Sequence, residues 1–191
     1  KALDTFGPGR HTLISGNLPL LGELLNWGVF RGDTPFKAEV IFTNHKVFTN
    51  QKWGTKEPVL FRDRELSMVR LRAFGIHSFR VTDAHRFVDT IVGTQGIVTS
   101  PQIADFLRNI IIGRLADFLG ETLQTIFDLP SSYDEIGTAM KARIRDDFGK
   151  YGLSVEDFII SAITPPEEVQ KRIDERSSMA LFGNLDHYMK Y

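Results

Sequence analysis

Alternating apolar and polar residues run from Ser67 to Val81 and predict one long β-strand. Successive side chains of a strand point to opposite faces, so one face should be buried and the other polar. The apolar face would carry Val69, Leu71, Ala73, Phe79 and Val81, and the polar face Arg70, Arg72, Ser78 and Arg80. Gly75 lies within the strand and predicts a bend or bulge. Shorter alternating stretches predict strands at 36–42 and 47–53.

Helical periodicity replaces this alternation after Val81. Asp83 is expected to cap a short helix, because an aspartate oxygen can accept a free backbone amide of the first turn. Ser100 and Pro101 then predict the start of a longer helix, in which apolar residues recur at three- and four-residue intervals. Pro130 should end this element, since proline cannot continue a helix.

A capping box of Ser132 and Glu135 predicts the next helix. Its buried side would carry Ile136, Met140, Ile144 and Phe148. Two-residue alternation returns at 153–163 and predicts a last strand. The two faces of that strand would be Leu153, Val155 and Asp157 against Ser154, Glu156 and Phe158. Thr164 and the two prolines after it predict the start of a final helix.

This order of elements predicts an α+β fold, in which helices pack against a twisted antiparallel or mixed sheet. We expect one domain over residues 1–163. The pattern leaves open a division into two lobes, a β-rich lobe at about 1–82 and an α/β lobe at 83–163. Residues 164–191 would form the start of a C-terminal helix that leaves the domain.

Composition and charge narrow the class of protein. The 191 residues are 42% hydrophobic and 25% charged, which is typical of a globular chain. Lysine and arginine number 23 against 24 acidic residues, so the chain as a whole lacks the positive field that favours nucleic acids. The absence of cysteine excludes disulfides, thiolate catalysis and cysteine-ligated zinc in these residues. Lys1 in place of methionine indicates a piece of a longer polypeptide.

The most apolar window, 13–30, contains polar residues, glycine and proline, so the sequence predicts no membrane-spanning segment. The window has a single acidic residue among the crowded apolar side chains, which include Leu20, Leu21, Leu24, Leu25 and Trp27. Ordinary core packing is one interpretation of this cluster. The other is an exposed apolar segment that enters the lipid interface or docks on a membrane partner, with Trp27 suited to that interface.

The polar residues predict no catalytic, cofactor-binding or metal-binding site. None of the five histidines lies in an HExxH motif, and no serine lies on a glycine-flanked elbow. Gly93 and Gly96 lack the lysine and the third glycine of phosphate-binding loops. The acidic pair Asp146 and Asp147 lies in a helical stretch where neighbouring side chains diverge, and we interpret both residues as solvated.

Three local matches resemble the SPFH superfamily, which contains stomatins, prohibitins and flotillins. The glycine-proline-glycine turn at 7–9 is similar to the early turn of these domains. The segment FRVTD at 79–83 resembles the family strand that ends in aromatic-x-Val-x-Asp, although Ala84 stands where many members have proline. The segment YGLSV at 151–155, with the prolines at 165–166, resembles the family's aromatic-Gly-Ile-x-Val strand and the proline that leads into a long C-terminal helix.

The resemblance implies a non-enzymatic scaffold, attached peripherally to the cytoplasmic face of a membrane, as in the bacterial virion-core-protein-like members. The implied partners are copies of the chain and either a membrane surface or an integral membrane protein, without nucleic acid or cofactor. Candidate contacts between copies are Val169, Ile173 and Leu181.

Two other functions remain open. The first is a soluble adaptor that binds one protein partner without self-assembly. The second is an unrecognised hydrolase that uses Asp63, Arg64 or His77.

Overall fold

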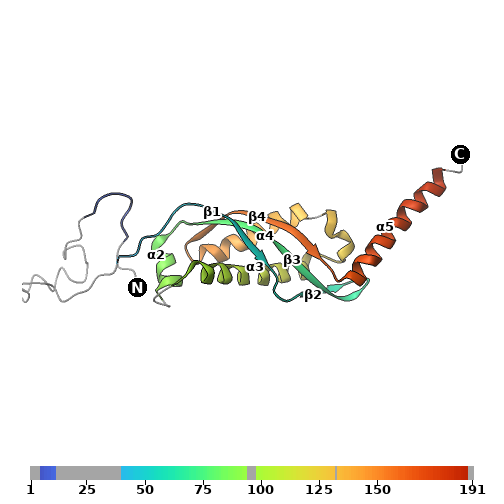
Figure 1. Ribbon diagram of the computed structural model, residues 1–191, viewed down its shortest axis with the longest axis horizontal. Coiled ribbons are helices and arrows are strands. Elements are labelled where there is room, and N and C mark those ends of the chain that lie inside the picture. Colours follow the sequence, from blue (N-terminus) through green and yellow to red (C-terminus); the bar gives the residue numbers. More distant parts are fainter. Residues whose placement is uncertain (1–4, 12–39, 94–97, 132, 189–191) are drawn as a thin grey trace, which may run out of the picture.

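The computed structural model describes residues 5–11, 40–93, 98–131 and 133–188. Its central element is the strand β3 (Ser67–Val81), which confirms the predicted long strand at both ends. The other described strands are β1 (Phe48–Gly54), β2 (Val59–Asp63) and β4 (Leu153–Thr164). Each of them pairs antiparallel with β3 (Figure 1). β2 pairs with the N-terminal part of β3, while β1 and β4 pair with its C-terminal part.

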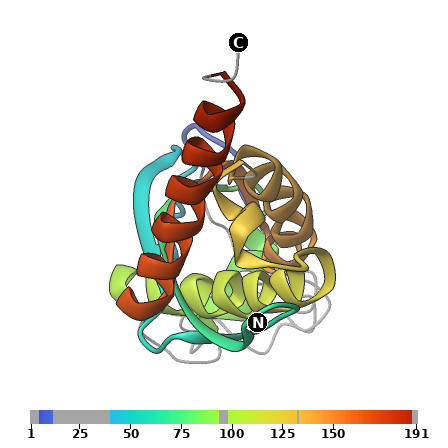
Figure 2. The same cartoon turned by 90° about the vertical axis from the view of Figure 1, so that its right-hand side faces the viewer.

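The described helical segments are α2 (Ala84–Phe87), η2 (Val88–Val92), α3 (Ser100–Thr122), η3 (Ile126–Ser131), α4 (Tyr133–Gly149) and α5 (Glu167–Tyr188). Viewed along the molecule, α3 and α4 lie on one side of the sheet (Figure 2). α5 leaves the end of β4 and extends away from the body (Figure 1). The predicted α+β fold with a departing C-terminal helix is confirmed.

One buried core joins the sheet to the helices. Alternate residues of β3 from Val69 to Val81 are buried, as a strand with one covered face requires. Ser78, predicted on the polar face, is buried as well. α4 contributes the four apolar residues predicted from sequence, Ile136, Met140, Ile144 and Phe148, all of them buried. α3 contributes Leu107, Ile111, Leu115, Phe118 and Leu119. The sheet and both helices therefore depend on each other for burial.

β4 departs from strict alternation. Its register with β3 shifts so that Phe79 faces Val155 and Ser78 faces Asp157, which leaves Glu156 as an extra residue. Phe158 is consequently buried and Asp157 exposed, the reverse of the predicted faces beyond Val155. The ring of Phe158 stacks on Trp53 of β1 with centroids 5.1 Å apart.

Other element boundaries also differ from the predictions. Residues 40–42 are not in a strand, and 36–39 lie outside the described residues. The N-cap of α3 is Thr99 rather than Ser100, because the Thr99 amide donates to Gln102 Oε1 at 2.8 Å. α3 ends at Thr122, before η3, so Pro130 is not its terminator.

Gly152 connects the end of β3 to the start of β4. Its φ of +73° is a left-handed conformation that glycine adopts without strain. Its carbonyl accepts the backbone amides of Thr82 and Asp83 at 2.9 and 3.1 Å. The side chain of Asp83 in turn accepts the Arg86 amide and caps α2, as predicted. The segments 79–83 and 151–155 therefore meet in space.

Candidate interaction surfaces

The contact residues predicted from sequence fall in two places. Leu20, Leu21, Leu24, Leu25 and Trp27 lie within 12–39, outside the described residues. Val169 and Ile173 lie on α5, where both are half-buried against the domain's own core. Leu181 lies on the same helix, beyond the part whose side chains are described. As candidates for contact between copies, these residues remain predictions.

The first half of α5 is fixed to the body of the domain. Besides Val169 and Ile173, Arg176 contributes two contacts. Its guanidinium donates to Glu65 Oε2 at 2.5 Å and lies 4.5 Å from the centre of the Phe127 ring. We call Glu65 and Phe127, with the core surface below Val169 and Ile173, the α5 seat. The seat sets the direction in which the helix leaves.

Asp63 holds two parts of the α5 seat together. It lies at the end of β2, is 2% exposed, and accepts the amides of Glu65 and Leu66 through one oxygen. The other oxygen accepts the Ile126 amide at 2.7 Å, which begins η3, the segment that carries Phe127. Burial raises the pKa of Asp63, but hydrogen bonds from these amides outweigh burial and leave the pKa below its usual value.

Beyond this attachment, the part of α5 whose side chains are described is solvated. Its residues from Asp174 to Met179 are all exposed, and the Met179 side chain is 73% exposed. A helix with so little contact to its own domain gains little stability from tertiary packing.

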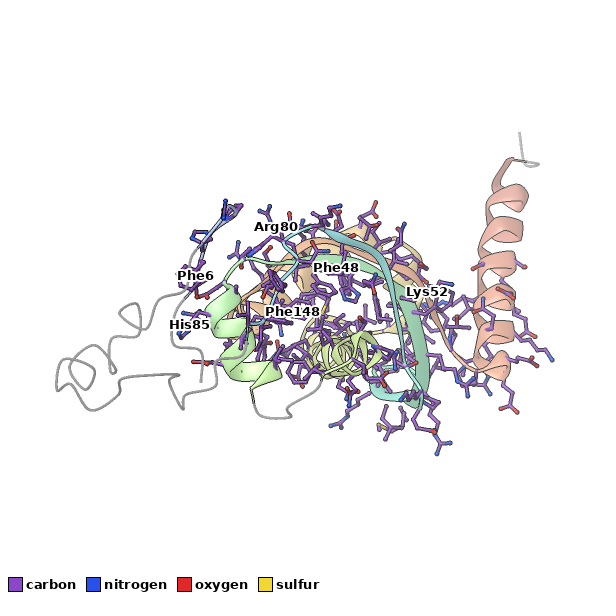
Figure 3. All side chains as sticks on the ribbon, turned by 60° about the vertical axis from the view of Figure 1, so that its left-hand side comes forward. Phe6, Phe48, Lys52, Arg80, His85 and Phe148 are labelled. Carbon is purple, nitrogen blue, oxygen red and sulfur yellow. The ribbon has the colours of Figure 1, made fainter. Side chains whose placement is uncertain are left out.

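A second exposed surface, which the sequence analysis did not single out as a site, is the side of the sheet opposite α3 and α4. Its residues on β3 include Met68, Arg70, Arg72, Phe74 and Arg80. We call this side the outer face; it also includes Lys52 of β1, Leu60 and Arg62 of β2, and Ile159 of β4. In Figure 3, Arg80 lies on the outer side of the sheet and Phe148 on the covered side. Apolar side chains such as Phe74, 53% exposed, distinguish this surface from an ordinary polar face.

The edge of β4, in contrast, is closed by two side chains of α4. Tyr133 Oη donates to the Ile163 carbonyl at 3.3 Å, and Lys141 Nζ donates to the Glu156 carbonyl. An open strand edge offers free backbone groups to another chain, so its coverage disfavours pairing there. Addition of a strand is therefore disfavoured at β4, whereas β1, among the described strands, pairs with β3 alone.

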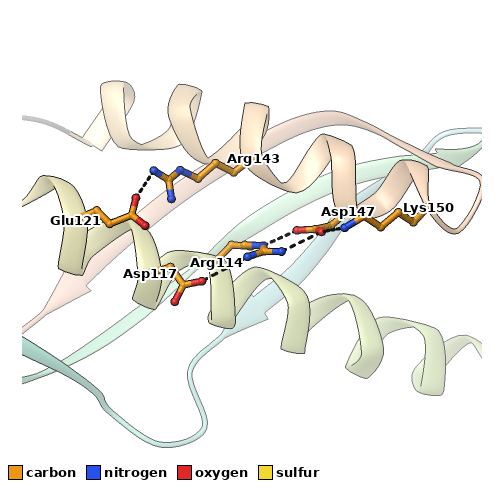
Figure 4. A network of polar contacts seen from close by, with 6 residues as sticks. All are labelled: Arg114, Asp117, Glu121, Arg143, Asp147 and Lys150. Atoms are coloured by element: carbon orange, nitrogen blue, oxygen red, sulfur yellow. Dashed lines mark hydrogen bonds and ion pairs between the residues drawn. The ribbon is translucent and has the colours of Figure 1, made fainter.

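A polar network joins α3 to α4 (Figure 4). Arg114 donates to both oxygens of Asp147, at 2.5 and 3.1 Å, and Lys150 donates to the same carboxylate at 2.7 Å. Asp147 is buried, so its interpretation as a solvated residue was wrong, while Asp146 is exposed as expected. The hydrogen bond from Arg114 and then that from Lys150 lower the pKa of Asp147 to about 2. Arg143 and Glu121 add a second link at 2.6 Å.

The buried carboxylate predicts acid sensitivity. Because its folded pKa is depressed from 3.8, Asp147 stabilises the fold above that pH, and this contribution disappears as pH falls through about 2. Asp147→Asn should lower the free energy of unfolding by about 2 kcal/mol at pH 7 and flatten its dependence on pH between about 4 and 2. Asp146→Asn is the matched control, with an expected change below about 0.5 kcal/mol. Urea unfolding at several pH values measures both, and equal effects would contradict the assignment.

Of the three residues considered for hydrolysis, Asp63 and His77 are buried within the fold and Arg64 is exposed. His77 is 2% exposed and its ring lies near Phe79 and Phe148, with centroids 5.8 and 6.1 Å away. Burial lowers the pKa of His77 to about 4, so it is neutral at pH 7. The oxygens of Asp63 are engaged by amides, and Arg64 is exposed in the β2–β3 turn. Asp63 also lines an open surface hollow with Arg64, but both of its oxygens are committed to backbone amides of its own domain.

Among the described residues, no three histidine, cysteine, aspartate or glutamate side chains are grouped as metal ligands would be. In the same part of the chain, every helix is too short or too polar to cross a bilayer.

The sequence of this chain matches known proteins. The sequence profile of the SPFH domain-Band 7 family matches residues 1–181. The chain belongs to the SPFH domain-Band 7 family. This SPFH domain is also 25% identical over 183 residues to a Bacillus subtilis (strain 168) protein described as "Uncharacterized protein YdjI". The alignment covers 95% of the present chain and 56% of YdjI, so the SPFH chain spans about half the length of that relative.

Proposed function

We propose that this SPFH domain is a non-enzymatic scaffold, attached peripherally to the cytoplasmic face of a membrane and assembled from copies of itself. Family membership supports the proposal, because SPFH domains are generally membrane-associated scaffolds without catalytic activity. The observation that carries it in this chain is the shape of α5. One half of the helix is fixed in the α5 seat and the other half projects into solvent (Figure 1).

The division of α5 into an attached half and a projecting half favours assembly of copies of the chain. Val169, Ile173 and Arg176 hold the helix at a defined angle, so the projecting part is presented in one direction. Apolar residues recur in the sequence of that part, at Leu181, Leu185 and Tyr188, with spacings of four and three. Such spacing is typical of helices that pair with other helices. Preorganised presentation reduces the entropy that association would otherwise lose.

Removing the projecting part tests this function. A chain that ends at Arg176 keeps Val169, Ile173 and the Glu65 contact, so its thermal midpoint should stay within about 3 °C of the 191-residue chain. In sedimentation velocity, the 191-residue chain should form oligomers and the shortened chain should sediment as a monomer. A monomeric 191-residue chain that captures one protein in a fixed stoichiometry would instead support the soluble adaptor.

A further inference from the structure

We propose that the outer face of the sheet binds the surface of an anionic lipid bilayer directly. The inference rests on the proposed function, in which the domain is attached to a membrane, and assigns the surface and the chemistry of that attachment. Of the contacts predicted from sequence, the two whose side chains are described, Val169 and Ile173, lie on α5 and not on this face.

The outer face is mainly positively charged. Its cations are Lys52, Arg62, Arg70, Arg72 and Arg80. Among ion pairs between described residues, only one involves these cations, the pair of Arg80 with Glu156 at 2.8 Å. Asp157 is an exposed acid at the same end of the sheet. The whole chain has a net charge of −1, so the unpaired cations represent a local concentration of positive charge.

Apolar side chains lie between these cations. Leu60, Met68, Phe74 and Ile159 are each more than half exposed. The strand register places Leu60 opposite Arg70 and Met68 opposite Arg62, so the two kinds of residue are neighbours. Ile159 faces Ile76 across the β3–β4 pair, and Ile76 is itself two residues from Phe74. The face is therefore both cationic and apolar along its length.

An anionic bilayer surface matches both properties. Guanidinium groups can bind lipid phosphates, while apolar side chains enter the boundary between headgroups and acyl chains. A nucleic acid duplex would neutralise the cations but leave the four apolar side chains in water. The closed edge of β4 also disfavours a partner that adds a strand beside β4. An anionic lipid surface is therefore the partner that contacts both the cations and the apolar side chains of the outer face.

Vesicle flotation of the 191-residue chain tests the assignment. The chain should float with vesicles of phosphatidylcholine mixed with phosphatidylserine, and much less with phosphatidylcholine alone. Arg70→Gln with Arg72→Gln removes two unpaired charges and should weaken partitioning roughly 25-fold, at about five-fold per charge. Phe74→Ser with Ile159→Ser should also weaken it, at unchanged charge. Arg108→Gln with Arg145→Gln, on the helical side, makes the same charge change and should leave partitioning within about two-fold.

Each contrary result has a distinct meaning. The inference is overturned if the chain does not float with phosphatidylserine vesicles, or if both outer-face variants float as well as the unchanged chain. Sedimentation of the same chain still tests self-assembly separately. Loss of self-assembly in the Arg70 and Arg72 variant, without loss of flotation, would assign the face to a second copy. Binding to a DNA duplex with the same dependence on Arg70 and Arg72 would also overturn the assignment to lipid. Circular dichroism of each variant checks that it is folded.

Discussion

Gly75→Ala should lower the free energy of unfolding by about 4 kcal/mol or prevent folding. A β-carbon at this position would lie 2.0 Å from the Ile159 carbonyl oxygen and 3.0 Å from the indole ring of Trp53. The first of these is backbone of β4, so relief requires the central pair of strands to separate. The second is a buried ring that stacks on Phe158. Urea unfolding followed by circular dichroism measures the loss.

Gly113→Ala provides the contrasting variant. Gly113 lies in α3, and a β-carbon there would meet no other atom within 4 Å. Alanine should stabilise the helix by about 0.5–1 kcal/mol, because it reduces the backbone freedom that the unfolded chain loses. If Gly75→Ala were as harmless as Gly113→Ala, the close approach of β3 to β4 would be wrong.

The sequence predicted the elements whose periodicity depends on local residues. The strand Ser67–Val81 and the buried side of α4 follow from spacing alone, because each has one covered face. The junction after β4 also follows, since Thr164 and the adjacent prolines cannot continue the strand pattern into α5. These are the elements that carry the family resemblance and fix the departure of the C-terminal helix.

Features that depend on distant partners were missed. The extra residue in β4 reverses Asp157 and Phe158, and only the pairing of β4 with Ser78 and Phe79 sets its position. Asp147 looked like a solvated acid because Arg114, which binds it, lies 33 residues earlier. Polarity alone gave no sign of this partner.

The outer face, too, could be predicted from local sequence only in part. Its arginines were predicted to share a face of β3, but Leu60 and Ile159 belong to other strands. Only the register with β3 brings them beside Arg70 and Ile76. The α5 seat is likewise assembled from the β2–β3 turn, η3 and α5, which are far apart in the chain. Both candidate surfaces are products of tertiary structure.

Asp63 is the residue on which the α5 seat depends most. The turn that follows it presents Glu65, and the Ile126 amide that it accepts begins the segment with Phe127. Arg176 contacts both Glu65 and Phe127. A change at Asp63 should therefore affect both the stability of the domain and the direction of a helix that Asp63 does not itself bind.

Asp63→Ala should lower the free energy of unfolding by about 3 kcal/mol, because the amides of Glu65, Leu66 and Ile126 lose their acceptor, and the hydrogen bond from Ile126 is buried while the other two are part-buried. Since the folded pKa is below 3.8, this contribution is present above that pH and is lost as pH falls through the folded value. Asp63→Asn, which keeps one acceptor oxygen, should lose less. Glu65→Gln is the matched control for the seat, since it weakens only the exposed contact with Arg176 and should change stability by less than about 1 kcal/mol. Urea unfolding at pH 7 ranks the three variants, and a spin-label distance from residue 178 to residue 146 reports the direction of α5. An Asp63→Ala domain with unchanged stability and an unchanged distance would show that the α5 seat forms without this carboxylate.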